Sequence, residues 1–204
     1  MKLNQSSIYG SVAIKFVDEL SRTRESIVVS QSGDNIIDLE NGFAVGIQLI
    51  TVACKKGGKL IFIGNGGSAA IASHQAVDYW KNGGLEAIAF NDASLLTCIS
   101  NDFGYEQVFS EPLKRFAHKG DVLLAISSSG RSPNILRGVE TARDQGCHVI
   151  TMSGFDESNP LRNRGDLNFY VSSYSYGIVE ISHLELLHAM LEDIMAFQSN
   201  AERR

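Results

Sequence analysis

The chain has 204 residues, 44% of them hydrophobic and 20% charged, so it is long enough to bury one substantial core. Its formal net charge of −5 argues against binding to nucleic acid or to a membrane surface, since both depend on an excess of Lys and Arg. Three isolated cysteines, and no apolar run near the roughly 20 residues that cross a bilayer, predict a cytoplasmic protein without disulfides.

The first 56 residues are expected to form helices. One face of the first helix carries Ile8, Val12, Phe16 and Leu20, and a second apolar pattern covers residues 36–50. The Ser-Gly-Asp sequence at residues 32–34 separates the two. Amphipathic helices ahead of a core need a partner surface, so we expect them to contact a neighbouring subunit.

From Lys59 on, short apolar runs alternate with longer periodic segments. The runs of strand length cover residues 60–63, 87–90, 122–126, 148–152 and 167–171. Because helical segments separate them, they predict βαβ crossovers and an α/β fold, a doubly wound, five-stranded parallel sheet flanked by helices. The whole chain, 1–204, is expected to be a single domain, with helices in 1–56 and an α/β core and C-terminal helix in 57–204.

Polar residues mark the expected helix starts. Ser68 and Ser94 are the predicted N-caps of two helices, and Ser132 precedes Pro133, which suits the first helical position. The last helix is expected to run from about Gly177 to Phe197.

A glycine-rich turn follows the first of these strands. Its sequence is Gly64-Asn65-Gly66-Gly67-Ser68, and the glycines let the backbone approach a ligand closely. An ordinary strand-to-helix connection explains such a turn equally well. The turn has neither the dinucleotide-binding spacing nor the Lys-Ser/Thr pair of a Walker loop, so no nucleotide cofactor is expected.

A serine-rich turn follows the third strand. Ser127, Ser128, Ser129 and Ser132 place four hydroxyl groups within six residues, just ahead of a helix. Backbone N–H groups and the helix dipole favour an anion there, although serines can also simply solvate a loop. Since a parallel sheet delivers both turns to its carboxyl edge, the expected ligand is a phosphorylated small molecule.

Four titratable side chains are candidates for acid–base chemistry. His74 and Asp78 lie four residues apart on one helix face, and Glu180 and His188 lie in the last helix. Carboxylate and imidazole groups transfer protons next to a carbonyl and also bind Zn²⁺, but each residue alone has an ordinary structural explanation. Eight helical residues span about 12 Å, so Glu180 and His188 reach a common point only if they lean together.

A third polar segment, Ser100-Asn101-Asp102-Phe103-Gly104-Tyr105, follows an apolar run. Asn101 and Asp102 suit either hydrogen bonds to sugar hydroxyls or a plain turn. Together with the two turns and His74, this segment resembles the sugar isomerase (SIS) family, and within it the phosphoheptose isomerases.

The resemblance implies a homotetramer with active sites at subunit interfaces that isomerises sedoheptulose 7-phosphate to D-glycero-D-manno-heptose 7-phosphate for surface heptoses. It implies catalytic roles for Asp78, His188 and Glu180. It implies Zn²⁺ ligation, one ion per subunit, by His74, Asp78, Glu180 and His188. The implied substrate contacts are Asn65, Gly66, Gly67, Ser68, Asn101, Asp102, Ser127, Ser128, Ser129, Ser132 and Glu180.

The chain departs from the family pattern at three positions. The family has a glutamate where this chain has Asp78, a glutamine where it has Glu180, and an aspartate where it has Gly177. All four expected metal positions still hold acceptable zinc ligands. The alternatives are a non-catalytic SIS scaffold, either binding sugar phosphates or associated with a replication initiator, and an isomerase of another phosphosugar.

Overall fold

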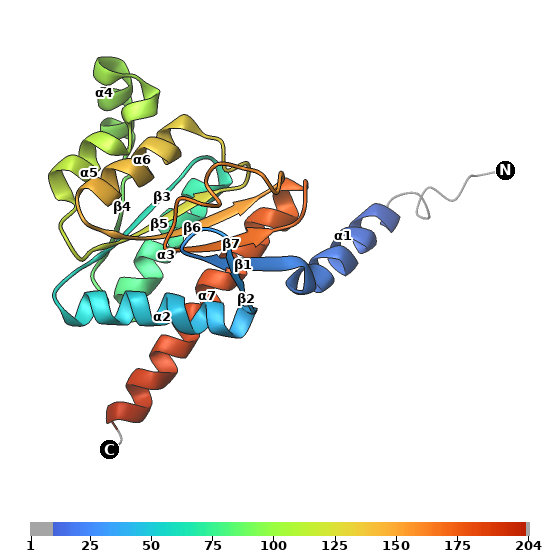
Figure 1. Cartoon of the computed structure of the whole chain (residues 1–204). Coiled ribbons are helices and arrows are strands. Elements are labelled where there is room, and N and C mark those ends of the chain that lie inside the picture. Colours follow the sequence, from blue (N-terminus) through green and yellow to red (C-terminus); the bar gives the residue numbers. More distant parts are fainter. Residues whose placement is uncertain (1–9, 203–204) are drawn as a thin grey trace.

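The computed structural model describes residues 10–202 as a three-layer α/β/α arrangement (Figure 1). Within that range, seven strands form one sheet in the order β2-β1-β7-β6-β5-β3-β4. The five strands from β7 to β4 are parallel. The chain order reverses beside β3, and a parallel sheet offers a ligand crevice at such a point.

All five predicted strands are confirmed. They are β3 (Leu60–Gly64), β4 (Ala87–Ala89), β5 (Val122–Ser127), β6 (His148–Gly154) and β7 (Leu167–Val171). Almost every residue of β3, β5, β6 and β7 is buried. Burial on both faces explains why these strands are continuous apolar runs without alternation.

The expectation that residues 1–56 are helical is wrong for one segment. Strands β1 (Ile27–Gln31) and β2 (Asn35–Ile37) form a hairpin, and the Ser-Gly-Asp sequence is its turn. β1 pairs antiparallel with β7, with Ile27 opposite Val171. The β-branched residues of β1 favour an extended backbone, and the open edge of β7 supplies the hydrogen-bond partners that a local pattern does not reveal.

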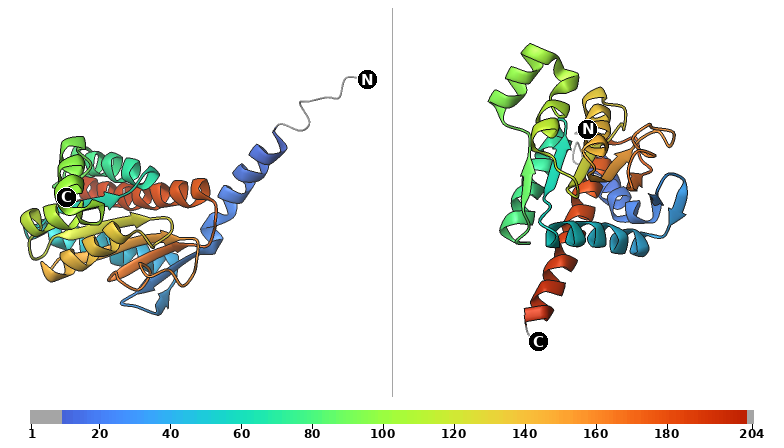
Figure 2. Two further views of the ribbon diagram at one scale, coloured as in Figure 1. Left: turned by 90° about the horizontal axis from the view of Figure 1, so that it is seen from above. Right: turned by 60° about the vertical axis from the view of Figure 1, so that its left-hand side comes forward.

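Helices cover both faces of the sheet. One face packs against α2 (Leu39–Lys55), α3 (Gly67–Lys81) and α7 (Tyr176–Glu202). The other packs against α5 (Ser110–Phe116) and α6 (Pro133–Asp144), with part of α4 (Ala93–Phe103). Helices α3 and α7 lie side by side, and their first residues follow strands at the same edge of the sheet (Figure 2). The amino-terminal residues of both helices therefore lie on one side of the molecule.

The helix starts differ from two of the predictions. Gly66, not Ser68, is the N-cap of α3, and Asp92, not Ser94, caps α4 by accepting hydrogen bonds from the backbone of its first turn. Asp and Ser are about equally good caps, so α4 begins at the earlier of the two, where Asp92 accepts from the backbone N–H groups of Ser94 and Leu95. Ser132 is the N-cap of α6, as predicted, with Pro133 at its first position. α7 extends five residues beyond its predicted end.

Helix α1 (Ser11–Arg22) projects from the body of the molecule (Figures 1 and 2). None of its residues is buried, and Val12, Ile14 and Val17 are exposed. Ile8, the first residue of the predicted apolar face, lies outside the described residues. Two short 3₁₀ helices, Thr23–Ser26 and Tyr105–Gln107, complete the secondary structure. No described helix has the length and apolar character to span a bilayer.

His183 makes folding sensitive to pH. Its ring is fully buried, and its Nε2 lies 3.1 Å from the carbonyl oxygen of Ser153. Burial lowers the pKa of His183 from 6.5 to about 4, although the hydrogen bond opposes the shift. Between these two pH values the unfolded chain binds the proton and the folded chain does not. The contribution of His183 to the free energy of unfolding is therefore fully present above pH 6.5 and is lost as the pH drops toward 4.

We therefore expect the protonation of His183 to lower the free energy of unfolding by about 3 kcal/mol as the pH falls from 6.5 to about 4. Urea unfolding at a series of pH values measures the loss. His183→Gln should show a correspondingly shallower pH dependence, whereas His148→Gln, at a half-exposed residue of β6, should follow the wild type. Parallel curves for wild type and His183→Gln would contradict the prediction.

Candidate active site

The two polar turns lie next to each other, as predicted. β3 and β5 are neighbouring parallel strands, with Gly64 opposite Ile126 at their carboxyl ends. Asn65, in the first turn, and Asn134, in the first turn of α6, exchange two side-chain hydrogen bonds of 2.9 and 2.8 Å. This reciprocal amide pair fixes the separation of the two turns and of the helices that follow them.

A hollow of about 280 Å³ lies between the turns. Its walls contain the predicted residues Asn65, Gly66, Gly67, Ser68, Ser127, Ser128, Ser129, Ser132 and Glu180, together with Tyr176. The amino-terminal residues of α3, α6 and α7 all contribute to it. Helix N-termini present unpaired N–H groups and the positive end of the dipole, so this hollow suits an anion.

The serine hydroxyls retain donors for such a ligand. Ser127 Oγ accepts from the backbone N–H of Gly130, and Ser129 Oγ accepts from that of Arg131. Both hydroxyls keep their own hydrogen to donate. Among the described residues, the buried Ser128 Oγ has no hydrogen-bond partner. A buried polar atom without a partner is costly unless a ligand or water satisfies it, which supports binding in this hollow.

A second group of side chains lies further along α3 and α7. The Nε2 atom of His74 lies 3.3 Å from Oδ2 of Asp78, and Nδ1 of His188 lies 3.9 Å from the same oxygen. The centroids of the two histidine rings are 5.4 Å apart. One ligand atom from each residue can be chosen so that all three lie within 4.8 Å of one another. Two imidazole nitrogens and a carboxylate oxygen are a donor set that fits Zn²⁺.

Glu180 does not join this group, so the predicted four-residue metal set is divided. A Cβ atom added at Gly67 would collide with the Glu180 carboxylate, which places that carboxylate against the glycine-rich turn. Eight residues of helix, about 12 Å, separate Glu180 from His188. The structure thus has one polar region around Glu180 and the serines and another around the two histidines.

Asn101 and Asp102 are not brought to the hollow. Both are exposed near the end of α4, where Asn101 Nδ2 donates to Asp102 Oδ1. Tyr105, from the same sequence segment, does reach the site: its hydroxyl donates to Asn65 Oδ1 at 3.1 Å.

Sequence reasoning missed Asn134, Tyr176 and Gln75. Asn134 is a buried polar residue. It directly follows Pro133, and a polar side chain in the first turn of a helix that begins at the serine turn is a signal that could have identified it. Gln75 is fully buried, and its Nε2 lies 3.0 Å from Nε2 of His188. Nothing in the local pattern indicates that contact, because 113 residues separate the partners.

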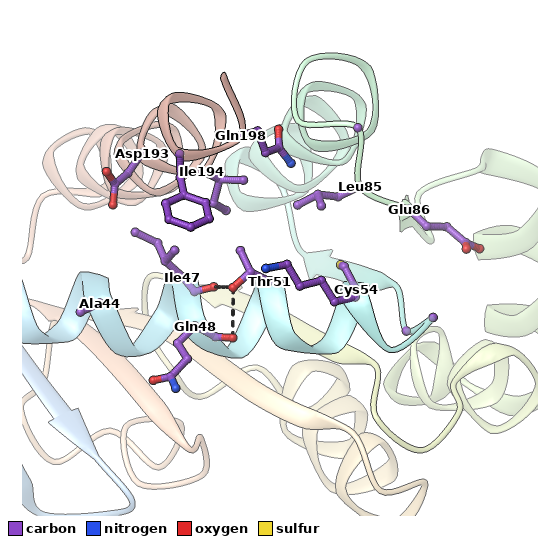
Figure 3. Close-up of a pocket in the computed structure, with 15 residues that line it drawn as sticks. Ala44, Ile47, Gln48, Thr51, Cys54, Leu85, Glu86, Asp193, Ile194 and Gln198 are labelled. Atoms are coloured by element: carbon purple, nitrogen blue, oxygen red, sulfur yellow. Dashed lines mark hydrogen bonds between the residues drawn. The ribbon is translucent and has the colours of Figure 1, made fainter. Parts of the chain in front are cut away.

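A larger groove of about 630 Å³ lies elsewhere, between α2 and the end of α7 (Figure 3). Ile47 and Thr51 of α2 face Ile194 and Gln198 of α7 across it. It contains none of the predicted site residues. Burial, followed by the charges of Asp121 and Glu86, raises the pKa of the Cys54 thiol in its wall to about 11, so that thiol is a poor nucleophile.

Known proteins are similar to this chain in sequence. Phosphoheptose isomerase from Serratia proteamaculans is 39% identical over 181 residues, which cover 85% of this chain and 91% of the relative. The enzyme of the same name from Sodalis glossinidius is 42% identical over 151 residues, covering 71% and 77%.

Two solved structures are similar throughout. Phosphoheptose isomerase GmhA from Neisseria gonorrhoeae has a TM-score of 0.76 at 32% identity, covering 90% of this chain and 97% of that one. A phosphoheptose isomerase from Francisella tularensis has a TM-score of 0.74 at 26% identity, covering 96% and 98%. The SIS domain family profile matches residues 36–154, which contain both polar turns, most of β2, and the strands β3, β4, β5 and β6. By sequence and by fold, the chain belongs to the SIS domain family.

Proposed function

We propose that this protein is an aldose–ketose isomerase that converts sedoheptulose 7-phosphate to D-glycero-D-manno-heptose 7-phosphate for heptose biosynthesis. Relatives that share about two fifths of its sequence and most of its length are named phosphoheptose isomerases. Similar solved structures carry the same name.

One observation carries the assignment: the site has two ends, joined by the same two helices. The anion-binding hollow lies at the first turns of α3 and α7, and the group of His74, Asp78 and His188 lies about two helical turns further along them. The corresponding separation, about 12 Å, is close to the length of an extended seven-carbon chain with a terminal phosphate. The phosphate and the reacting carbons therefore fit at opposite ends.

The hollow binds the phosphate group. Ser127, Ser128 and Ser129 donate hydroxyl hydrogen bonds, and the first N–H groups of α3 and α6 complete the anion site. Glu180 carries a carboxylate, which repels phosphate, so its oxygens are suited to accept hydrogen bonds from the sugar hydroxyls beside it.

The second end carries the proton transfers. Asp78 takes a proton from C1 of the ketose and returns it to C2, while His188 moves protons between the two neighbouring oxygens. A Zn²⁺ ion held by His74, Asp78 and His188 would take over the task of His188, because it would polarise those oxygens as a Lewis acid. The exposed ring of His74 and the partly exposed ring of His188 leave the group accessible to a sugar.

The assembly is part of the proposal. We infer a homotetramer, supported by α1, which projects from the body and leaves an apolar face exposed. An isolated helix of that length is marginal in water, so a neighbouring chain is its natural partner. Asn101 and Asp102 remain proposed substrate contacts, from an exposed helix end that a neighbouring subunit can approach.

Incubation of the purified protein with sedoheptulose 7-phosphate tests the function. We expect NMR to show formation of the heptose 7-phosphate aldose, with or without a requirement for added Zn²⁺. A protein that binds the ketose in a thermal-shift assay but forms no aldose under either condition would instead support the non-catalytic SIS scaffold.

A further inference from the structure

The ring of His188 has different neighbours at its two nitrogens. Nδ1 faces the Asp78 carboxylate at 3.9 Å, on the side where His74 also lies. Nε2 faces away, toward the side chain of Gln75 at 3.0 Å. Any metal ion shared with His74 and Asp78 must therefore use Nδ1, since Nε2 already has a protein partner.

Gln75 is held firmly enough to act on that ring. It is fully buried on the inner side of α3, against α7. One helical turn further on, the hydroxyl of Tyr79 donates a 3.0 Å hydrogen bond to the backbone oxygen of Leu187, which fixes the register of the two helices. Burial raises the pKa of Tyr79 well above its usual range, so this donor stays neutral.

The present arrangement of Gln75 corresponds to one tautomer of His188. The amide nitrogen Nε2 of Gln75 faces the ring and can only donate, so the ring nitrogen that it meets must be unprotonated. A neutral ring then carries its proton on Nδ1, which points toward Asp78. The amide oxygen of Gln75 is buried and has no hydrogen-bond partner among the described residues.

Metal binding requires the opposite tautomer. A ring that ligates through Nδ1 must carry its proton on Nε2, and that N–H needs an acceptor. The unpartnered amide oxygen of Gln75 becomes that acceptor if the side-chain amide makes a half-turn about its last bond. The same residue can thus satisfy both tautomers, one with each end of its amide.

We propose that Gln75 is a positioning residue that sets which nitrogen of His188 carries the proton, and that its amide turns over when a metal ion binds to His74, Asp78 and His188. The inference rests on the metal site of the proposed function. It assigns a role to a residue that contacts neither the metal nor the sugar, and it implies that His188 transfers protons through Nδ1 only while no metal ion occupies that nitrogen.

Two variants test the hydrogen-bond donor and the hydrogen-bond acceptor of the Gln75 amide. Gln75→Glu offers only acceptor oxygens, so the proton of His188 should already lie on Nε2 without metal. Gln75→Met has a similar volume and neither a donor nor an acceptor, so neither tautomer is held. Gln48→Met makes the same change at an exposed position of α2, remote from His188, and is the matched control.

The experiment uses the full chain, ¹⁵N-labelled at histidine, at mildly alkaline pH where a neutral ring is observed. Long-range ¹H–¹⁵N spectra should place the His188 proton on Nδ1 in the metal-free wild type and on Nε2 after Zn²⁺ is added. In Gln75→Glu the proton should be on Nε2 throughout. Competition with a chelating dye should show Zn²⁺ binding weakened about 10- to 100-fold in Gln75→Met and unchanged in Gln48→Met.

Three results would overturn the inference: a proton on Nε2 in the metal-free wild type, no change of tautomer with Zn²⁺, or wild-type Zn²⁺ affinity in a folded Gln75→Met variant. Circular dichroism establishes that each variant is folded. None of these readouts involves a sugar. If the protein isomerises the sugar but gives one of these three results, only the proposed role of Gln75 is refuted. If it gives the expected results but shows no turnover, only the proposed isomerase activity is refuted.

Discussion

Asp78→Asn is expected to reduce isomerisation by at least about a thousandfold while leaving sugar-phosphate binding measurable. The substitution keeps the shape of the side chain but removes the group that accepts the proton, and general-base catalysis contributes roughly 10²- to 10⁴-fold. The hollow between the polar turns, which is the proposed phosphate site, does not include Asp78, so the thermal shift produced by sedoheptulose 7-phosphate should persist. Initial rates and thermal-shift titrations measure the two effects.

The matched control is Asp193→Asn, the same change at an exposed position of α7, which should retain wild-type turnover. Undiminished turnover in Asp78→Asn would contradict Asp78 as the base, and would place the reacting carbons at the other carboxylate of the site, Glu180. Loss of binding together with turnover would mean that Asp78 holds the site together and would contradict a role confined to proton transfer.

Gly64→Ala is expected to lower the free energy of unfolding by about 4 kcal/mol and to abolish activity. A Cβ atom at Gly64 would collide with the backbone oxygen of Ser68, in the first turn of α3. A clash with backbone cannot be relieved by a side-chain rotation, so β3 and α3 must separate. That movement would displace the N–H groups of the phosphate site. Urea unfolding and isomerase assays test both consequences.

Gly177→Ala provides the comparison. Its added Cβ would meet only ring atoms of Phe16, at 3.1 Å, and Phe16 belongs to the projecting helix α1. Alanine also has a higher helix propensity than glycine, so stability should change by less than about 1 kcal/mol. If Gly64→Ala were as mild as Gly177→Ala, the close approach of β3 to α3 would not be the reason for glycine at position 64.

The sheet was largely predictable because its strands are buried on both faces. A run such as Leu60–Gly64 contains almost nothing but apolar residues, and the two polar turns follow such runs directly. The carboxyl ends of neighbouring parallel strands meet at one edge, so the serine and glycine turns were correctly expected to lie together. His74 and Asp78 were placed on one face by helical spacing alone.

Other features escaped prediction because distant contacts create them. Strand β1 exists because the edge of β7 pairs with it, and no periodicity within residues 27–31 indicates that partner. Glu180 and His188 do not lean together along their shared helix, because the Glu180 carboxylate lies against the glycine-rich turn at Gly67. Asn101 and Asp102 were expected beside the ligand, whereas Tyr105 of the same segment makes the contact.

The amino-acid order specifies local chemistry: which segments are strands, where turns can approach an anion, and which side chains share a helix face. These properties depend on a few neighbouring residues and on the repeat of the helix or strand. The packing of α3 against α7 specifies the rest. It joins Gln75 to His188 across 113 residues and separates the serine-lined hollow from the group of His74, Asp78 and His188, because distances between helices depend on the whole core.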